Sequence, residues 1–215
     1  HYPLRRQRQM CIRDRAILVS SYRLSCYSGK RRRLGMFQDI ELIIFDLDGT
    51  IAQLDIDWTR LKKELTQRFG PDFGYIDRGI EKARGRARKE AYKIIETYEL
   101  ENIANLIPNK KIIELIQSLK NKRLALFSTN MRKTVKEVFK NLGLQDLFSP
   151  IIAKEDVIKH KPHPEGLLRI LDLTKVNREK AIYIGDLNKD FETGRRARIE
   201  TWLVEQLLER WQNES

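Results

Sequence analysis

The chain has 215 residues, which is long enough for one α/β domain with a small inserted domain and a sizeable hydrophobic core. Apolar residues make up 41% and charged residues 33% of the chain, a balance typical of a globular protein, and no apolar run approaches the roughly 20 residues of a membrane-spanning helix. The formal net charge of +12 suggests a polyanionic partner, but this charge is unevenly distributed.

The first 35 residues hold most of the excess positive charge and both cysteines. They contain ten Lys/Arg residues and one acid, whereas the other 180 residues contain 32 Lys/Arg and 29 Asp/Glu. Because the body of the protein is nearly balanced in charge, the net charge says little about nucleic acid binding. With Cys11 and Cys26 both in the first segment, we expect no disulfide framework and no cysteine zinc site in the body, and a reducing, cytoplasmic compartment fits.

Residues 1–35 show no sustained helical or strand period. We interpret them as a non-native or disordered basic segment, because RRQRQMCIRDR is similar to translated sequencing-adapter sequence and Met36 offers a start just before the first predicted strand. Two other interpretations are open: an organelle transit peptide, rich in Arg and Ser, or an arm that binds nucleic acid through the basic run Lys30–Arg33. We expect a chain that begins at Met36 to keep full activity and stability.

Beyond residue 41, short apolar runs alternate with amphipathic helical stretches. The first run, Leu42–Phe45, is uniformly apolar, as expected of a strand in a sheet that is covered on both faces. Further runs lie at Leu124–Phe127, Ile151–Ala153, Ala181–Ile184 and Thr201–Val204. The helical stretches centre on residues 112–119, 135–142 and 167–171, and Gly143 closes the second of them. This alternation predicts an α/β fold with an open, doubly wound parallel sheet, whose ligands bind at the carboxyl ends of the strands.

One interval breaks the alternation because it contains helical patterns alone. Apolar residues recur at helical spacing from Trp58 to Phe69, where Gly70 and Pro71 end the first helix. A second, longer helix is predicted from Ile76 to Tyr98. We therefore predict a small helical cap over residues 57–105, inserted into a core domain that comprises residues 36–56 and 106–215.

Two carboxylates, Asp46 and Asp48, follow the first apolar run. Alternation along an extended chain places both on the same side, where they repel each other unless a cation lies between them. Hard oxygen ligands of this kind suit Mg²⁺, and Gly49 allows a sharp turn after the strand. The simpler interpretation is an Asp-Gly turn that ends a strand. We favour the metal-binding interpretation.

Polar residues also follow three other predicted strands. The hydroxyl of Thr129 and the amide of Asn130 can donate to phosphate oxygens, or the pair can be the N-cap of the next helix. Lys161 precedes a proline and either neutralises a phosphoryl group or is a solvated loop lysine. Asp186 supplies a further carboxylate for the cation. Asp190 lies at the start of a helix, either as a capping or first-turn acid or as a group that supports the metal ligands.

Together, these four features resemble the motifs of the haloacid dehalogenase superfamily of phosphotransferases. The resemblance covers roughly residues 40–205: Phe45–Thr50 matches the first motif, Thr129–Asn130 the second, Lys161–Pro162 the third and Gly185–Asp190 the fourth. The position of the cap, directly after the first motif, resembles the branch that contains phosphoglycolate phosphatases and β-phosphoglucomutases. The resemblance implies a Rossmann-like core domain with a helical cap.

The resemblance also implies a role for each acid. Asp46 is expected to attack phosphorus in line and form an aspartyl-phosphate, while Asp48 protonates the leaving alkoxide and later takes a proton from water. Mg²⁺ is expected to be held by the Asp46 carboxylate, the backbone carbonyl of Asp48 and Asp186. Thr50 is expected to orient Asp48 through its hydroxyl. Because dehalogenases of this fold lack an acid at the position of Asp48, its presence favours phosphoryl transfer.

Four further residues are expected to contact the phosphoryl group or the substrate. The resemblance implies that Thr129, Asn130 and Lys161 stabilise the charge on the transferring group, with Thr129 and Lys161 acting as catalytic residues. Thr50 is assigned to the same binding set. Asp190 is expected to support the metal ligands without touching the metal ion itself.

We predict a magnesium-dependent, cytoplasmic phosphatase that hydrolyses a small phosphate monoester, either phosphoglycolate-like or a sugar phosphate, with no membrane partner. One alternative is a phosphomutase of the β-phosphoglucomutase type, although a short cap favours hydrolysis because a mutase must exclude water. An alternative of another class is a nucleic-acid-binding or regulatory module that uses the basic N-terminal segment. In the cap, Arg84 and Arg88 lie one helical turn apart and either bind a substrate carboxylate or form a solvated basic face.

Overall fold

The computed structural model describes residues 35–119 and 121–213 of the chain. The interpretation of residues 1–35 as a separate basic segment therefore concerns, apart from Gly35, residues that lie outside the described part. The described part begins with a short 3₁₀ turn, η1 (Gly35–Phe37), whose Phe37 is buried against the ring of Trp202 at a centroid distance of 5.7 Å.

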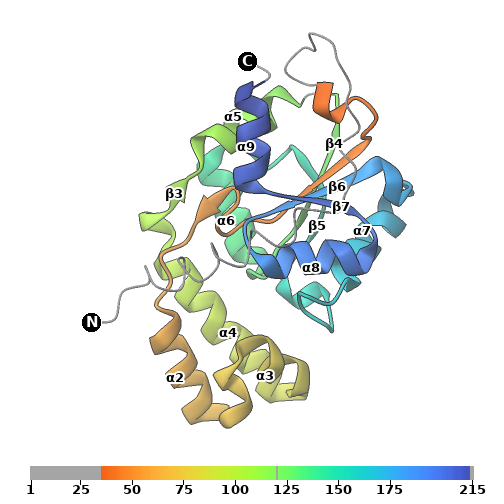
Figure 1. Ribbon diagram of the computed structural model, residues 1–215. Helices are drawn as coiled ribbons and strands as arrows, with labels where there is room; N and C mark the ends of the chain where they lie inside the picture. The colour runs from red at the N-terminus through yellow and green to blue at the C-terminus, as the bar shows by residue number, and fades with distance from the viewer. Residues whose placement is uncertain (1–34, 120, 214–215) are drawn as a thin grey trace, which may run out of the picture. The chain divides into compact units, whose positions relative to one another are not determined.

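A five-stranded parallel sheet forms the centre of the fold (Figure 1). The strands are β1 (Leu42–Phe45), β4 (Arg123–Phe127), β5 (Phe148–Ile152), β6 (Ala181–Gly185) and β7 (Glu200–Leu203). They lie in the order β5-β4-β1-β6-β7, and every neighbouring pair runs parallel. The chain thus moves outward from β1 through β4 to β5 and then adds β6 and β7 on the other side of β1. This doubly wound arrangement confirms the predicted fold class.

Helices cover both faces of this sheet (Figure 1). They are α5 (Lys110–Ser118), α6 (Arg132–Leu142), α7 (Glu165–Thr174), α8 (Asn188–Ala197) and α9 (Val204–Asn213). Side chains of α5, α6 and α9 share one hydrophobic cluster with Ile43 and Phe45 of β1, and side chains of α7 and α8 share a second cluster with Leu42 and Ile44. Because successive residues of a strand point to opposite faces, β1 is buried on both sides, which explains its uniformly apolar sequence.

Three helices lie between β1 and α5, in the interval predicted as helical: α2 (Trp58–Phe69), α3 (Ile76–Lys82) and α4 (Gly85–Glu101). The segments that connect them to the sheet run side by side, because β2 (Ala52–Gln53) pairs antiparallel with β3 (Ile107–Pro108). This pairing holds together the two ends of the segment that contains α2, α3 and α4. We refer to the five-stranded sheet and the helices that cover it as the sheet domain. Short 3₁₀ turns complete the described elements: η2 (Pro71–Gly74), η3 (Ile103–Asn105), η4 (Lys154–Asp156) and η5 (Arg178–Lys180).

The prediction of one long helix over residues 76–98 is wrong, because the chain leaves the helical conformation at Ala83 and Arg84, which both have extended backbone angles. The break is stabilised by two arginines. Arg84 and Arg88 donate from their guanidinium groups to the carbonyl oxygens of Glu81 and Ala83. These carbonyls lie at the end of α3, where a helix has no partner of its own for them.

The sequence patterns did not predict the last helix, α9. They assigned the whole apolar run Thr201–Val204 to a strand. Val204 is instead the first residue of α9, and β7 ends at Leu203. Leu207 of this helix is fully buried in the same cluster as Trp202. The helix thus closes the face of the sheet that carries α5 and α6.

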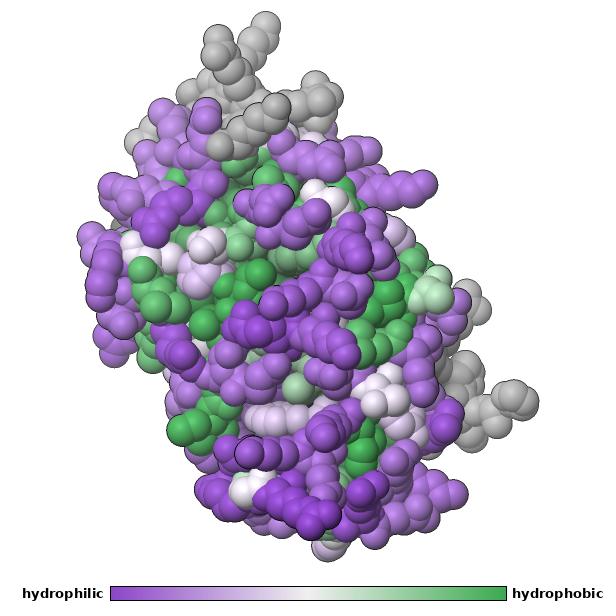
Figure 2. Space-filling model, turned by 180° about the vertical axis from the view of Figure 1, so that it is seen from behind, coloured by the Kyte–Doolittle hydropathy of each residue, from purple (hydrophilic) through white to green (hydrophobic). Residues whose placement is uncertain are grey.

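The surface is mostly hydrophilic, as the charged content of 33% leads one to expect. On the face shown in Figure 2, hydrophilic side chains predominate and the apolar ones lie in separate patches between them. Within residues 35–119 and 121–213, no helix is both long enough and apolar enough to cross a membrane.

Candidate active site

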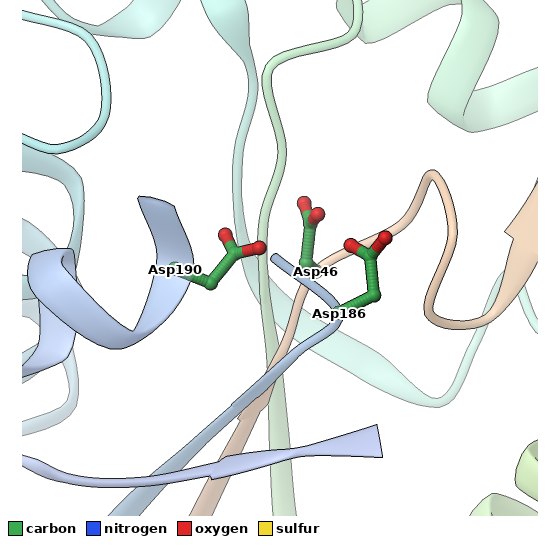
Figure 3. A group of neighbouring side chains, drawn as sticks. All are labelled: Asp46, Asp186 and Asp190. Carbon is green, nitrogen blue, oxygen red and sulfur yellow. The ribbon is translucent and has the colours of Figure 1, made fainter. Parts of the chain in front are cut away.

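Three carboxylates come together beside the carboxyl ends of two neighbouring strands. Asp46 directly follows β1, and Asp186 directly follows β6, which pairs with β1. Asp190, in the first turn of α8, completes a group in which one carboxylate oxygen of each residue lies within 4.8 Å of those of the other two. Figure 3 shows the three side chains close together at the point where the strands end. The parallel sheet thus brings together acids that are more than 100 residues apart in the sequence.

Lys161 reaches this group from the loop that precedes α7. Its ammonium nitrogen lies 2.7 Å from Asp46 Oδ1 and 2.8 Å from Asp190 Oδ1, and 1% of the side chain is exposed. The ammonium also lies 4.9 Å and 5.4 Å from the ring centres of Phe127 and Tyr183. Burial lowers the pKa of Lys161, but the two carboxylates outweigh burial and the pKa is raised. The alternative of a solvated loop lysine is therefore wrong.

Asp190 is anchored by three groups. Its Oδ1 accepts hydrogen bonds from the Lys161 ammonium at 2.8 Å and from the Tyr183 hydroxyl at 2.7 Å, and its Oδ2 accepts one from the N–H of Leu187 at 3.1 Å. Burial raises the pKa of Asp190, but Lys161 outweighs burial and the pKa is lowered. Asp190 therefore satisfies an N–H at the start of α8 and also fixes the position of Lys161.

Asp46 and Asp186 form a donor set that fits a hard divalent cation. Burial raises the pKa of Asp46 to about 6 against the opposing effect of Lys161. Burial also raises the pKa of Asp186 to about 7, helped by the negative charges of Asp46 and Asp190. Within the described residues, Asp186 Oδ1 is buried and has no hydrogen-bond partner. Repelling carboxylates with an unpartnered buried oxygen suit an ion such as Mg²⁺, and Asp46 and Asp186 are the acids that could hold it.

A tight turn after β1 brings Asp48 to the cavity described below. Its Oδ1 accepts a 2.8 Å hydrogen bond from the N–H of Leu54, and burial raises its pKa. Gly49 makes this turn possible, because its φ is +83° and a Cβ at this position would lie 2.2 Å from Asp186 Oδ2. Glycine is therefore required here by the backbone angle and by the close approach of Asp186.

The prediction that Thr50 orients Asp48 and binds the substrate is wrong. Thr50 is fully buried, and its hydroxyl has no hydrogen-bond partner among residues 35–119 and 121–213. The turn at Gly49 carries the chain back into the interior at this point. Asp48 is oriented by the N–H of Leu54 instead of by the Thr50 hydroxyl.

The loop after β4 brings one of its two predicted phosphate-binding residues to the cavity. Thr129 lines it. Asn130 is 2% exposed, and its Oδ1 accepts a 2.9 Å hydrogen bond from the Ser128 hydroxyl, to which the N–H of Asn130 donates at 3.0 Å. The prediction that Asn130 binds the phosphoryl group is therefore wrong for its side chain, which stabilises the shape of the loop that carries Thr129.

Glu99 of α4 contacts the same loop and was missed in the sequence. It is fully buried, and its Oε2 accepts a 2.8 Å hydrogen bond from the N–H of Met131, which caps α6. The sequence did contain a signal, because Glu99 follows the buried residues Ala91 and Ile95 at four-residue intervals. An acid on the apolar face of a helix indicates a buried polar contact.

The catalytic candidates line a cavity of about 700 Å³ between the sheet domain and the helices α2 and α3. The sheet domain contributes Asp46, Asp48, Thr129, Lys161 and Asp190 to its lining. The helical part contributes Trp58, Lys62, Tyr75, Ile76, Asp77, Arg78 and Glu81.

Arg84 and Arg88 do not line this cavity. Their guanidinium groups are bound to carbonyl oxygens at the end of α3, as described above. Of the two interpretations given for these arginines, the one in which they bind a substrate carboxylate does not fit these contacts.

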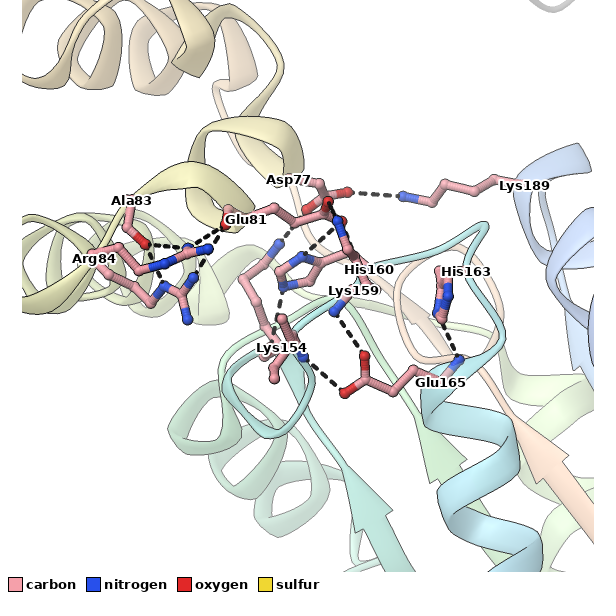
Figure 4. A network of polar contacts seen from close by, with 12 residues as sticks. Asp77, Glu81, Ala83, Arg84, Lys154, Lys159, His160, His163, Glu165 and Lys189 are labelled. Carbon is pink, nitrogen blue, oxygen red and sulfur yellow. Dashed lines mark hydrogen bonds and ion pairs between the residues drawn. The ribbon is translucent and has the colours of Figure 1, made fainter.

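Two acids of α3, Asp77 and Glu81, contact the sheet domain beside the cavity (Figure 4). Asp77 lies 2.8 Å from the ammonium of Lys154 and 3.5 Å from that of Lys189. Glu81, one turn later, accepts a 3.0 Å hydrogen bond from the N–H of His160, the residue before Lys161. We refer to Asp77 and Glu81 as the acidic pair. It connects α3 to three segments that surround the candidate catalytic residues.

Two proteins of known activity align with most of this chain. The phosphoglycolate phosphatase of Aquifex aeolicus is 29% identical over 180 residues, which cover 77% of this chain and 84% of that protein. The pyrophosphatase PpaX of Oceanobacillus iheyensis is 26% identical over 180 residues, covering 77% and 83% of the two chains. Both alignments therefore extend over most of each protein.

Solved structures show the same fold. A putative haloacid dehalogenase-like hydrolase from Bacteroides fragilis has a TM-score of 0.55 at 28% identity and covers 75% of this chain and 86% of its own. A putative phosphoglycolate phosphatase from Lactobacillus plantarum has a TM-score of 0.58 at 22% identity, with 79% and 88% covered. The family model described as haloacid dehalogenase-like hydrolase matches residues 43–204, from β1 to the start of α9. As the sequence motifs predicted, the chain belongs to the haloacid dehalogenase-like hydrolase family.

Proposed function

We propose that the protein is a magnesium-dependent phosphatase that hydrolyses an organic phosphate monoester through an aspartyl-phosphate on Asp46. The observation that carries this proposal is the environment of Asp46. Its side chain is 8% exposed, it lines the cavity at the end of the central strand, and its Oδ1 lies 2.7 Å from the Lys161 ammonium. A carboxylate attacks a phosphate only when nearby cations offset the repulsion between two negative groups, and Lys161 is a permanent cation in that place.

The Asp46 and Asp186 carboxylates and the backbone carbonyl of Asp48 would hold Mg²⁺. When bound, the ion offsets negative charge on the phosphoryl group and on the carboxylate that attacks it. The buried Asp186 Oδ1, which lacks a hydrogen-bond partner in the described part of the chain, supports this assignment. Asp190 would act indirectly, by keeping Lys161 beside Asp46.

Asp48 would move the proton in both half-reactions. Its carboxylate lines the cavity and is oriented by the N–H of Leu54 at 2.8 Å, and its raised pKa, caused by burial, lets it hold a proton more readily than a free aspartic acid. It would protonate the leaving alkoxide as the phosphoryl group moves to Asp46. It would then take a proton from the water that hydrolyses the aspartyl-phosphate. Thr129, also in the cavity lining, would donate its hydroxyl to a phosphoryl oxygen.

Two relatives, a phosphoglycolate phosphatase and a pyrophosphatase, act at phosphorus by their names, which supports the same chemistry for this chain. We also propose that residues 36–56 and 106–215 act as the catalytic core domain and residues 57–105 as the cap that shapes the space for the leaving group.

The test is hydrolysis of p-nitrophenyl phosphate by the wild-type protein and by Asp46→Asn, with Mg²⁺ and with EDTA. We expect activity in Mg²⁺ alone, and a loss of at least about 10³-fold in kcat for Asp46→Asn with an unchanged circular dichroism spectrum. Asp55→Asn is the matched control, because Asp55 is an exposed acid of the same segment outside the cavity lining, and it should keep wild-type activity. Full turnover by Asp46→Asn would exclude Asp46 as the nucleophile.

Release of inorganic phosphate separates hydrolysis from the phosphomutase alternative. A phosphatase releases one phosphate for each ester consumed, whereas a mutase converts one sugar phosphate into its isomer without net release. Stoichiometric release from a sugar phosphate supports the phosphatase, and isomer formation without release supports the mutase.

A further inference from the structure

The cap side of the cavity repeats one arrangement of side chains. Trp58 and Lys62 lie one turn apart on α2, and Tyr75 and Arg78 lie three residues apart where α3 begins. Trp58 and Lys62 share a face of α2 at this spacing, whereas Tyr75 is the extended N-cap residue directly before α3. All four residues line the cavity, so this wall consists of two aromatic rings, each followed by a cation. We refer to these four residues as the cap wall.

Both rings of the cap wall are open to solvent. Trp58 is 41% exposed and Tyr75 is 72% exposed, although each carries a large apolar surface. A single exposed ring is ordinary on a protein surface. Two exposed rings on one wall of a cavity are typical of a site that binds a flat apolar group.

The two cations of the cap wall, Lys62 and Arg78, are less occupied by protein carboxylates than the other cations of the cavity and are therefore more available to bind an anion. Lys154, Lys161 and Lys189 also line the cavity, but Lys161 is bound to Asp46 and Asp190, while Lys154 and Lys189 face Asp77. Lys62, by contrast, has no hydrogen-bond or ion-pair partner within the described part of the chain.

Arg78 is also only partly engaged. Its Nε lies 3.4 Å from Asp72, and 61% of its side chain is exposed. The four N–H donors of its two terminal nitrogens therefore remain open to a ligand. Lys62 and Arg78 together offer a site for a second negative charge.

The size of the cavity favours a substrate larger than a two-carbon acid. Its volume is about 700 Å³. Ligand cavities of about 300 to 1,000 Å³ hold drug-sized molecules. The phosphoryl group would occupy the end of this space beside Asp46, so the remainder is available to the leaving group.

We infer that the cap wall of Trp58, Lys62, Tyr75 and Arg78 binds a leaving group that carries both an aromatic ring and a second anionic group. The ring would stack on Trp58 and Tyr75, and the anion would pair with Lys62 and Arg78. A nucleoside that carries two separate phosphates has this chemistry. The inference rests on the proposed phosphatase function and adds the class of its substrate.

The test compares three substrates with Mg²⁺: phosphoglycolate, which has a second anion but no ring, AMP, which has a ring but no second anionic group, and adenosine 3′,5′-bisphosphate, which has both. We expect kcat/KM to be highest for the bisphosphate, by about tenfold or more over each of the others. A higher kcat/KM for phosphoglycolate would overturn the inference.

Two variants test separately whether Lys62 binds the second anion and whether Trp58 binds the ring. Lys62→Gln should raise KM about tenfold for the bisphosphate and leave KM for AMP within about twofold, because AMP lacks the second anion. Trp58→Leu should raise KM for both nucleotides and leave KM for phosphoglycolate unchanged. Lys63→Gln is the matched control, since Lys63 is an exposed lysine of α2 outside the cavity lining, and it should change no KM.

The outcomes separate this inference from the proposed function. If hydrolysis depends on Asp46 but Lys62→Gln and Trp58→Leu leave every KM unchanged, the inference is overturned and the phosphatase function stands. If the wild-type protein hydrolyses none of the three esters nor p-nitrophenyl phosphate, both are overturned.

Discussion

The carboxylate of Glu99 accepts a 2.8 Å hydrogen bond from the N–H of Met131 and so links α4 to the loop that carries Thr129. The link is completely buried. Burial raises the pKa of Glu99 to about 7, although the Met131 N–H and the Thr134 hydroxyl favour the ionised form. A titrating group therefore lies between the proposed cap and the candidate active site.

The buried Glu99 makes stability depend on pH in a predictable direction. Its pKa is about 7 when folded, against 4.5 for a free glutamic acid, so the folded protein binds more protons between these values. The free energy of unfolding contributed by Glu99 must therefore fall as pH rises through this range. The full effect is about 3 kcal/mol, from roughly 1.4 kcal/mol per pKa unit. Glu99→Gln keeps an acceptor oxygen and does not titrate, so it should gain stability over the wild type between about pH 5 and pH 8.

Urea unfolding of both proteins at several pH values measures this difference. Glu101→Gln serves as the control, because Glu101 is an exposed acid of the same helix. A difference between wild type and Glu99→Gln that stays constant with pH would show that Glu99 does not titrate in this range.

The contact of Asp77 with Lys154 predicts that the acidic pair holds α3 against the sheet domain. The Lys154 side chain is 5% exposed and would be left buried without its partner in Asp77→Asn. Removing one member of a buried pair is costly, but Asp77 is itself 31% exposed, so we expect a loss of about 1 to 2 kcal/mol in the free energy of unfolding. Amide exchange should become faster in α3 and remain slow in β1.

Asp72→Asn is the matched comparison for Asp77→Asn. Asp72 belongs to the same helical part and pairs with Lys82, but both side chains are largely exposed, at 42% and 52%. It should leave stability and the exchange rates unchanged. Equal effects of the two substitutions would mean that the contact with Lys154 does not hold α3 in place.

Asp190 should matter for catalysis although it is not proposed to touch the substrate. Asp190→Asn keeps an oxygen for the Tyr183 hydroxyl but removes the charge that lies 2.8 Å from Lys161. Because Lys161 is 1% exposed and retains only Asp46, we expect a loss of about 2 kcal/mol in the free energy of unfolding and a lower kcat. Asp172→Asn, which breaks an exposed pair with Lys175, should change neither quantity. An unchanged kcat in Asp190→Asn would remove Asp190 from the positioning of Lys161.

The sequence was sufficient to predict the sheet and most of the acids in the site. Uniformly apolar runs such as Leu42–Phe45 have no stable place except between two covered faces, and a parallel sheet brings the residues after its strands to one edge. Asp46, Asp186 and Lys161 could therefore be grouped before any coordinates were known. Their proximity follows from the order and direction of the strands, which the alternation of apolar runs and amphipathic stretches predicts.

Contacts that depend on tertiary packing could not be predicted in this way. Asp77 and Lys154 are 77 residues apart, and each alone is indistinguishable from a solvated charge on a surface. Thr50 and Asn130 were assigned by their place in motifs, but which side of a loop becomes buried depends on turns of one or two residues. The break between α3 and α4 at Ala83 could not be predicted either, because apolar residues recur at helical spacing on both sides of it.

Binding of the metal ion should change the stability of the wild type relative to that of Asp186→Asn. In EDTA at about pH 8, above the pKa values of Asp46 and Asp186, the carboxylates of Asp46, Asp186 and Asp190 are ionised and repel, because one oxygen of each lies within 4.8 Å of those of the others, so Asp186→Asn should be more stable than the wild type. In Mg²⁺, only the wild type keeps the full donor set and gains stability from binding, by about 1.4 kcal/mol when the free ion exceeds its Kd tenfold. Adding Mg²⁺ should therefore raise the thermal midpoint of the wild type by more than that of the variant. Asp146→Asn, at an exposed position, should respond to Mg²⁺ as the wild type does. Equal responses of Asp186→Asn and the wild type to Mg²⁺ would show that the ion does not bind at Asp186.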